Sequence, residues 1–542
     1  MIWRRKLVAT GAAESGCSVV MLGIGFVKTG MRKVSILPCM ALHYLIMDIS
    51  SLSVAHAQFG VSALAFFLFP VLAVALAWFL AFLRWREYRG GNQGWMSVYL
   101  FWARVFSIVL VLAVLTALPL LLQFGVTWPG LMPRVGSIAS PLLAAGLVGL
   151  LLLKFCGLRL MLHRRELVSP RLHLLSVIWV ALCLTLLLFC LVVYQAWTHA
   201  PVGVTLVDGR YRVDDWWQIL FNPLLAVYLP WLVLAGLAAL SFLVMAVLSL
   251  KMQRKPQDDG LHLVFRSAVV LTLVSTTLLL PVSLFAGTQL QQWQPAKAAA
   301  VAGYWQTGTE PRVALLAWPN QEALQNDFAW VVNGGGGYWL KKQPDGTVEG
   351  LDKYGGMLPP VALVFWSARV LLVLLIVMPL IAWRVWAVGG WRRFDVARLT
   401  PARLKMLRHA GWLGLAALAA GLLVMEAGKL PYAVQGTVTY FELLEGGLYE
   451  SGDLGMLLCF VALAIGTWWF FYIWLRRAAV QHIDVFEPVP LLVTATPVID
   501  TVLSEPDETV VVEPDPSVAT TVADEIAGGQ SGTDVEADRS QA

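Results

Sequence analysis

Nine long apolar runs dominate this sequence and constrain what it can fold into. A helix that crosses the hydrocarbon core of a bilayer needs about 20 mostly apolar residues. Only 13% of the 542 residues are charged, against about 25% in a soluble domain. We therefore expect an all-α, polytopic protein whose bundle of about nine transmembrane helices lies in the lipid bilayer, with no nucleic-acid partner. The runs are 61–83, 97–122, 139–162, 173–196, 219–250, 266–287, 361–388, 409–428 and 453–475.

The charge of the connecting loops predicts the orientation of this bundle. Lys and Arg gather after the first, third, fifth and seventh runs, at 84–89, 163–171, 251–255 and 391–410. The alternate loops are poor in both residues, and 438–453 is acidic. Because basic loops stay on the cytoplasmic side, we predict an external start and a cytoplasmic C-terminus.

The two ends of the chain differ from the helical body. Residues 1–46 carry basic residues that would lie outside, against the charge rule, and lack a good signal-peptide pattern. We expect an upstream mis-start or a disordered extension, with Met47 as a natural start. Residues 479–542 are rich in Pro, Val, Thr and acids, which predicts a disordered acidic cytoplasmic tail. Helices one to six then fall within 47–287, and helices seven to nine within 361–478.

One external loop, residues 288–360, is long. It holds the sequence NGGGG at 333–337 and a Pro-Asp-Gly segment at 344–346. Pro-Asp-Gly favours a tight hairpin turn. The turn and the tryptophans of the loop predict a folded flap, because loops of this length without structure are uncommon.

Several stretches of the chain form a set of motifs in a fixed order. The stretches are AQFGVSALAFFLFP (57–70), QFGVTWPG (123–130), SPRLHLLSVIWVALC (169–183), WTHAPVG (197–203), FNPLLAV (221–227), WQPAKAAAVAGYWQT (293–307), FWSARVLL (365–372) and EAGKLPYAV (426–434). They resemble motifs of one known family, subunit I of the cytochrome bd quinol oxidases. The nine helices, the external start and the long loop after the sixth helix also match that family.

The resemblance implies a function in respiratory electron transfer. Members of the family oxidise quinol at the external loop and pass electrons through two b haems to a haem d, where oxygen is reduced to water. The resemblance also implies a multi-pass protein of the bacterial inner membrane. Its partner would be subunit II of a bd-type oxidase or a second subunit I-like chain.

The positions that should ligate haem depart from the family pattern. The resemblance places two histidines and one methionine as ligands of the b haems, and these positions hold Phe66, Trp231 and Leu371. Two acids of the third helix fall on Ala145 and Leu153. Phe, Trp and Leu cannot donate to iron. Haem b and haem d are therefore implied by the family but not supported by these residues, and we assign no metal ligand.

Histidine placement leads to the same conclusion without the family. Haem iron takes His, Met, Cys or Tyr as its axial ligand, and none of the eight histidines lies in the middle of a predicted helix. The histidines are His43, His56, His163, His173, His199, His262, His409 and His482. The side chains that remain as alternative ligands are His56, His173, His199, Met378, Met425 and Cys156.

Two further groups of residues are candidates for a site. Lys297, Trp293 and Trp305 of the external loop would form an aromatic, cationic quinone pocket, or else an interfacial aromatic anchor. The family glutamate that follows the loop lysine falls on Ala302. The family GRQPW signature is similar to Gly428, Lys429, Leu430, Pro431 and Tyr432.

Arg369 and Glu426 are charged residues inside predicted spans, where charge is costly. At 1.5 Å per residue they lie at similar depth below the external surface. We predict that they form an intramembrane ion pair. The alternative, implied by the family, is a haem-propionate clamp and a haem-adjacent acid.

Two functions remain open from the sequence. The first is a divergent subunit of a quinol:oxygen oxidoreductase that still transfers electrons. The second is a haem-poor, non-catalytic structural subunit that pairs with a haem-bearing partner. The resemblance supports the first, and the ligand positions support the second.

Overall fold

The computed structural model describes residues 51–90, 93–162, 168–253, 259–390, 394–443 and 454–480. The expected mis-start or extension at 1–46 lies outside these residues. So does the expected tail at 479–542, except for its first two residues.

Nine helices within the described residues are long and apolar enough to cross a membrane, as the sequence predicts. The all-α membrane fold is therefore confirmed, whereas its orientation stays a prediction. The spanning elements are α2 (Ser51–Gly90), α3 (Gln93–Gly125), α4 (Leu131–Leu152) with the π-helix η2 (Leu153–Leu158) and α5 (Arg159–Leu162), α6 (Pro170–His199), α7 (Trp216–Leu220) with α8 (Leu225–Met252), α9 (Asp259–Trp293), α11 (Val361–Gly389), α12 (Pro401–Ala410) with α13 (Leu413–Ala427), and α15 (Leu454–Val480).

The fifth span is broken near its N-terminal end, between α7 and α8. Buried Asn222 stabilises the break, because its Oδ1 accepts the N–H of Leu224 at 2.9 Å and its Nδ2 donates to the carbonyl of Ala200 at 2.8 Å. The eighth span is also broken, into α12 and α13. The apolar run at 219–250 gives no sign of the first break, and α12 lies mostly in the basic segment at 391–410 rather than in the run at 409–428.

The core of the bundle lies around α2 and the α7–α8 span, in which 78% of the most apolar window is buried. In α15 this share is 17%, so most of that helix faces outward. Small residues let α13 approach α8 closely. A Cβ atom on Gly414 would lie 2.5 Å from Cα of Ala239, and one on Gly411 would lie 2.6 Å from Cβ of Ala246.

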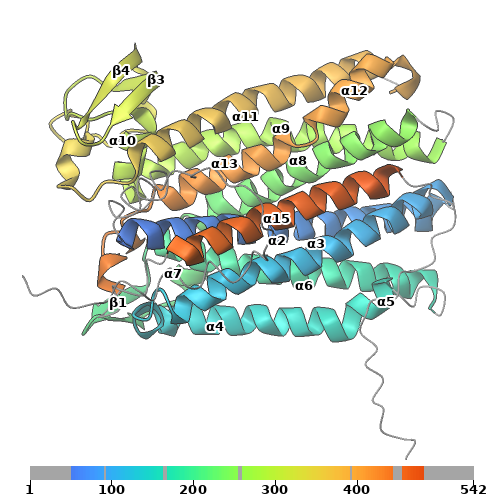
Figure 1. Ribbon diagram of the computed structural model, residues 1–542, viewed down its shortest axis with the longest axis horizontal. Helices are drawn as coiled ribbons and strands as arrows, with labels where there is room; N and C mark the ends of the chain where they lie inside the picture. The colour runs from blue at the N-terminus through green and yellow to red at the C-terminus, as the bar shows by residue number, and fades with distance from the viewer. Residues whose placement is uncertain are drawn as a thin grey trace, which may run out of the picture. The chain divides into compact units, whose positions relative to one another are not determined.

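The loops at one end of the helices carry short antiparallel sheets, of which β1 and β3–β4 are labelled in Figure 1. The pairs are β1 (Val204–Val207) with β2 (Arg210–Val213), β3 (Arg312–Asn320) with β4 (Gln325–Asn333), and β5 (Tyr432–Val434) with β6 (Val438–Thr439). The loops that carry the sheets also contain short 3₁₀ turns, which are η4 (Gly335–Tyr338), η5 (Leu351–Tyr354) and η7 (Phe441–Leu443). A fourth 3₁₀ turn, η6 (Val396–Arg398), follows α11.

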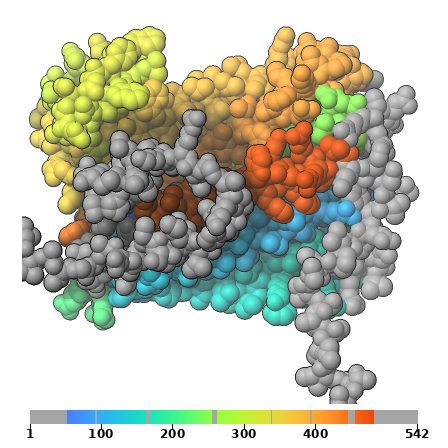
Figure 2. Space-filling view, viewed as in Figure 1, coloured from blue at the N-terminus to red at the C-terminus, as the bar shows by residue number. Residues whose placement is uncertain are grey.

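The loop at 288–360 is folded. It begins within α9, continues into α10 (Pro295–Ala302) and forms the β3–β4 hairpin, which projects as a yellow-green lobe in Figure 2. The expected turn at 344–346 is present, because the N–H of Gly346 donates to the carbonyl of Gln343 at 3.0 Å. The longer β3–β4 hairpin was not predicted.

Candidate functional site

Trp231 of α8 occupies one of the positions at which the family resemblance expects a haem ligand. Its side chain is buried, and its Nε1 donates to Oγ of Ser283 on α9 at 3.0 Å. A Cβ atom on Gly421 of α13 would overlap the indole ring. The indole therefore fills the space between α8, α9 and α13, and leaves no room there for a haem.

The other positions have apolar surroundings. Leu371 of α11 packs against the helical core, and Leu153 in η2 is buried. Ala145 on α4 faces outward. Phe66 of α2 is partly buried and lines a cavity. Leu371 and Phe66 cannot ligate the iron of a b haem, and Ala145 and Leu153 carry no acid.

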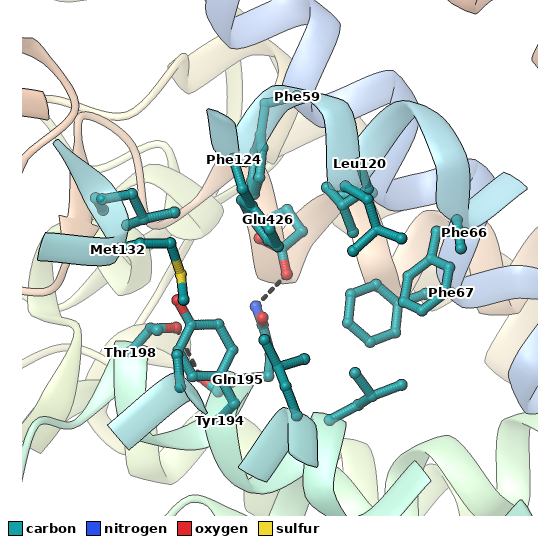
Figure 3. A pocket seen from close by; sticks show the side chains of 18 of the residues that line it. Phe59, Phe66, Phe67, Leu120, Phe124, Met132, Tyr194, Gln195, Thr198 and Glu426 are labelled. Carbon is teal, nitrogen blue, oxygen red and sulfur yellow. Dashed lines mark hydrogen bonds between the residues drawn. The ribbon is translucent and has the colours of Figure 1, made fainter. Parts of the chain in front are cut away.

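The cavity beside Phe66 has a volume of about 120 Å³ and lies among α2, α3, α4, α6 and the segment after α13 (Figure 3). We call it the α3–α4 pocket. One side is apolar and the other is polar. The apolar side includes Phe59, Phe66, Phe67, Leu120, Leu121, Phe124 and Leu143, and the polar side includes Tyr194, Gln195, Thr198, Glu426, Lys429 and Tyr440.

A buried hydrogen-bonded group forms the polar side of this pocket. Gln195 of α6 donates through Nε2 to Oε1 of Glu426 (Figure 3). The other carboxylate oxygen, Oε2, lies 3.8 Å from Nζ of Lys429. Lys429 also donates to Oγ1 of Thr198 at 3.3 Å, and it is 4% exposed. The two residues from α6 were not singled out in the sequence, although Gln195 interrupts an apolar run.

Lys297 of α10 lies behind the same group. Its Nζ donates to the carbonyl of Met425 at 3.0 Å, and the residue is 2% exposed. A Cβ atom on Gly428 would overlap the lysine side chain, so the glycine of the GRQPW-like motif makes this approach possible. Burial lowers the pKa of Lys297 to about 7, with Glu426 opposing the shift and Lys429 adding to it. Burial also lowers the pKa of Lys429, and Glu426 opposes that shift.

His199, the last residue of α6, completes this charged group. Its Nδ1 lies 2.8 Å from the carbonyl oxygen of Gln195, and its Nε2 lies 3.1 Å from that of Met425. Carbonyl oxygens only accept hydrogen bonds, and a neutral imidazole has one N–H. Both contacts are therefore hydrogen bonds only when the ring carries two protons. Neither nitrogen is directed toward the pocket as a free ligand.

The predicted ion pair between Arg369 and Glu426 is wrong. Arg369 donates instead to three carbonyl oxygens of the external loop: to Leu315 at 2.8 Å, to Val301 at 2.9 Å, and to Ala314. Glu426 bonds to Gln195 and pairs with Lys429. Similar depth on two helices does not make two side chains face each other. Here Arg369 faces α10 and β3, whereas Glu426 faces α6.

The three residues of the predicted quinone pocket contact different neighbours. Trp305 donates through Nε1 to Oδ1 of Asn326 at 2.8 Å and lines an open pocket of the loop with a volume of about 540 Å³. The lining of that pocket includes neither Lys297 nor Trp293. Trp293 packs against the helical core. The structure therefore does not bring the three side chains together around one ligand.

Two alternative haem ligands among the histidines have defined surroundings. His173 accepts a hydrogen bond at Nδ1 from Arg84 at 2.8 Å, and its Nε2 lies 3.2 Å from the carbonyl of Met161. His56 lies in the second turn of α2, because that helix begins ten residues before the predicted run. Its ring stacks on Trp128 at 6.0 Å, and its Nε2 is enclosed without a hydrogen-bond partner.

No group of three His, Cys, Asp or Glu side chains comes together as a metal site in the described part of the chain. Of the remaining alternatives, Met378 and Met425 are buried and Cys156 is exposed. The side chains at the expected positions do not fit the haem groups of the family.

Comparisons with known proteins agree on one family. The model of "Cytochrome bd terminal oxidase subunit I" matches residues 54–483. "Cytochrome bd ubiquinol oxidase subunit 1" of Bacillus subtilis is 24% identical over 418 residues, which are 72% of this chain and 85% of the relative. "Cytochrome bd-II ubiquinol oxidase subunit 1" of Escherichia coli is 28% identical over 277 residues, which are 50% of this chain and 54% of the relative.

A solved structure supports the same fold. The bd oxidase from Geobacillus thermodenitrificans superposes with a TM-score of 0.68 at 16% identity, covering 79% of this chain and 99% of the matched chain. At this identity the match shows the fold alone.

Proposed function

The chain belongs to the cytochrome bd terminal oxidase subunit I family, and from this membership we propose that it is a membrane subunit of a bd-type quinol oxidase complex. The family match covers most of the chain, and the nine spanning helices agree with it. The names of its relatives support a role in quinol oxidation. The family and the nine apolar helices support a place in the bacterial inner membrane.

We further propose that this chain is a haem-poor subunit that pairs with a haem-bearing partner. That partner is subunit II or a second subunit I-like chain. The observation that carries this proposal is the packing of Trp231, whose indole bonds to Ser283 and lies against Gly421. A family histidine at this position would need an open space for a macrocycle beside it, and that space is filled.

The second candidate is a redox subunit, which one observation favours. Lys297, Arg369 and Glu426 are kept at positions that the family resemblance connects with quinol and haem, and each is at least partly buried. In this reading quinol would bind at the external loop, near the open pocket lined by Trp305.

The haem content of the purified chain distinguishes the two candidates. The chain is expressed alone and then together with candidate partners, and haem is measured by the pyridine haemochrome assay. We expect far less than one haem per chain for the protein alone, and haem in the complex that co-purifies. The Bacillus subtilis relative, prepared in parallel, controls for haem supply.

A content near one haem per isolated chain would contradict the haem-poor proposal. Alanine substitutions at His56, His199 and Met425 would then identify the ligand, because loss of haem in one variant without loss of folding assigns it.

The orientation is part of the same proposal. Reporter fusions near residues 90, 165, 255 and 400 should be cytoplasmic, and fusions near 130, 205, 325 and 445 should be external. The basic loops support this assignment. Reversed signals at more than one site would overturn it.

A further inference from the structure

We propose that the α3–α4 pocket binds the carboxylate of a single-chain amphiphile, such as a long-chain fatty acid, that enters from the bilayer between α3 and α4. This inference does not depend on the haem content of the chain or on its place in an oxidase complex. It rests on the charges at the polar side, the size of the cavity and the position of its opening.

In the described part of the chain, the charges behind the pocket do not balance while Lys297 is protonated. Lys297 and Lys429 are both buried, and Glu426 is the carboxylate that lies within reach of Lys429. A buried charge is costly unless it is paired and hydrogen-bonded. One added carboxylate would give each of the two ammonium groups a counter-charge.

Lys429 is the group that such a carboxylate would meet, because it lines the pocket itself. Its contacts are long: 3.8 Å to Oε2 of Glu426 and 3.3 Å to Oγ1 of Thr198. An ammonium group has three donors, and charge-assisted hydrogen bonds to carboxylates are about 2.7–2.9 Å long. Lys429 therefore has capacity for a closer acceptor. Glu426 lines the pocket as well and repels an anion. Its Oε1 accepts from Gln195 and its Oε2 lies 3.8 Å from Lys429, so binding depends on the excess of two buried lysines over this one carboxylate.

The size of the cavity limits the ligand. Its volume is about 120 Å³, close to the cavity of about 150 Å³ that holds a benzene molecule in an engineered protein. Pockets that enclose a drug-sized ligand are about 300–1,000 Å³. The α3–α4 pocket therefore takes a small head group and the first part of a chain, but not a macrocycle or a whole phospholipid head group.

The opening of the pocket determines where the rest of the ligand lies. Leu121 of α3 is 56% exposed and Leu143 of α4 is 39% exposed, and both line the pocket. Both helices are candidate membrane spans, so these side chains face hydrocarbon. An acyl chain that leaves the pocket between them stays in the apolar phase, while its carboxylate reaches Lys429.

The test compares two probes that differ only in the charge of the head group. Oleate and methyl oleate are titrated against the full chain in detergent, as competitors of a fluorescent fatty acid, with the thermal midpoint as a second readout. We expect oleate to bind at least ten-fold more tightly than methyl oleate and to raise the midpoint. Lys429→Met should remove this preference. Lys342→Met, which changes an exposed lysine of the external loop, should retain it.

A second variant keeps the proposal falsifiable if Lys429→Met does not fold. Leu143→Trp narrows the opening without a change of charge, and it should weaken oleate at least ten-fold. Equal binding of the two probes to the native chain would overturn the carboxylate assignment. Unchanged oleate binding in Leu143→Trp would place the ligand elsewhere. Decylubiquinone that displaces the probe more strongly than oleate would assign a neutral head group instead and contradict the proposal.

Discussion

Two positions in this molecule, Trp231 and Phe66, have lost the histidine that the family resemblance places there, and their surroundings differ. At Trp231 the indole is buried, bonds to Ser283 and lies against Gly421. At Phe66 the ring is partly buried and borders the α3–α4 pocket of about 120 Å³. The indole of Trp231 fills the ligand position because its neighbour Gly421 has no side chain. The ring of Phe66 leaves a cavity beside it.

The location of each position explains this difference. Trp231 lies in the central span α7–α8. Lipid cannot fill a void there, so the atoms that line such a void lose their packing contacts. Phe66 lies beside a pocket with exposed Leu121 and Leu143 in its wall. Acyl chains can enter such a pocket, so an open space there costs less than a sealed one. The following predictions test whether the two positions differ in this way.

The largest effect is expected for Trp231→Ala. Removing a buried large aromatic side chain costs about 3–5 kcal/mol, and it also leaves the hydroxyl of Ser283 without the donor Nε1 of Trp231. Thermal or denaturant unfolding of the protein in detergent measures this. Trp217→Ala is the control, because Trp217 is 70% exposed and should change stability little. If Trp231→Ala lowers the free energy of unfolding by less than about 1 kcal/mol, the site collapses around the change or was never filled. The packing at Trp231 and at Phe66 would then not differ.

The second prediction concerns the partner of the indole. Gly421→Ala forces a methyl group into the Trp231 ring, and overpacking of this kind costs about 1–3 kcal/mol. The control is Gly466→Ala on α15, where a Cβ atom would meet nothing within 4 Å. The double variant Gly421→Ala, Trp231→Phe should recover part of the loss, because the smaller ring makes room. Equal stability losses in the single and double variants would show that the glycine is needed for another reason.

The sequence predicts the helices of this protein far better than its site. Nine spans follow directly from apolar length, because hydrocarbon requires each backbone to bond within its own helix. The break at Asn222 was missed, since it depends on a hydrogen bond to Ala200 at the end of another helix. The ion pair of Arg369 with Glu426 failed because spacing gives depth along a helix but not direction around it. The hydrogen bond of Gln195 could not be predicted from the sequence either, because its partner Glu426 is 231 residues away.

The third prediction uses pH to test the charged group behind the pocket. Burial lowers the pKa of Lys297 from 10.5 in the unfolded chain to about 7. Between these values the unfolded state binds more protons, so stability rises with pH. Below about pH 7 both states are protonated, and the full cost of burial is present. We expect the native chain to gain about 1 kcal/mol relative to Lys297→Met from pH 7.5 to 8.5, at 1.36 kcal/mol for each pKa unit.

Lys342→Met again serves as the control, since Lys342 is exposed and should leave the pH profile of the native chain unchanged. A flat difference between the native chain and Lys297→Met would show that Lys297 keeps its charge throughout this range. The polar side of the pocket would then hold two permanent charges, on Lys297 and Lys429. The difference between this charged site and the uncharged surroundings of Trp231 would be larger.

The smallest effect is expected for Phe66→Ala, at most about 1 kcal/mol, in the range of substitutions outside a sealed core. The ring is partly buried at the wall of a pocket that opens toward the bilayer, so detergent or acyl chains can fill the space that it leaves. Phe69→Ala on the same helix is the matched control, because Phe69 is fully buried and stacks on Trp468 with ring centroids 4.4 Å apart. That change should cost about 3–5 kcal/mol. If Phe66→Ala proves as costly as Phe69→Ala, the pocket is sealed in the folded protein, and the two lost ligand positions do not differ in packing.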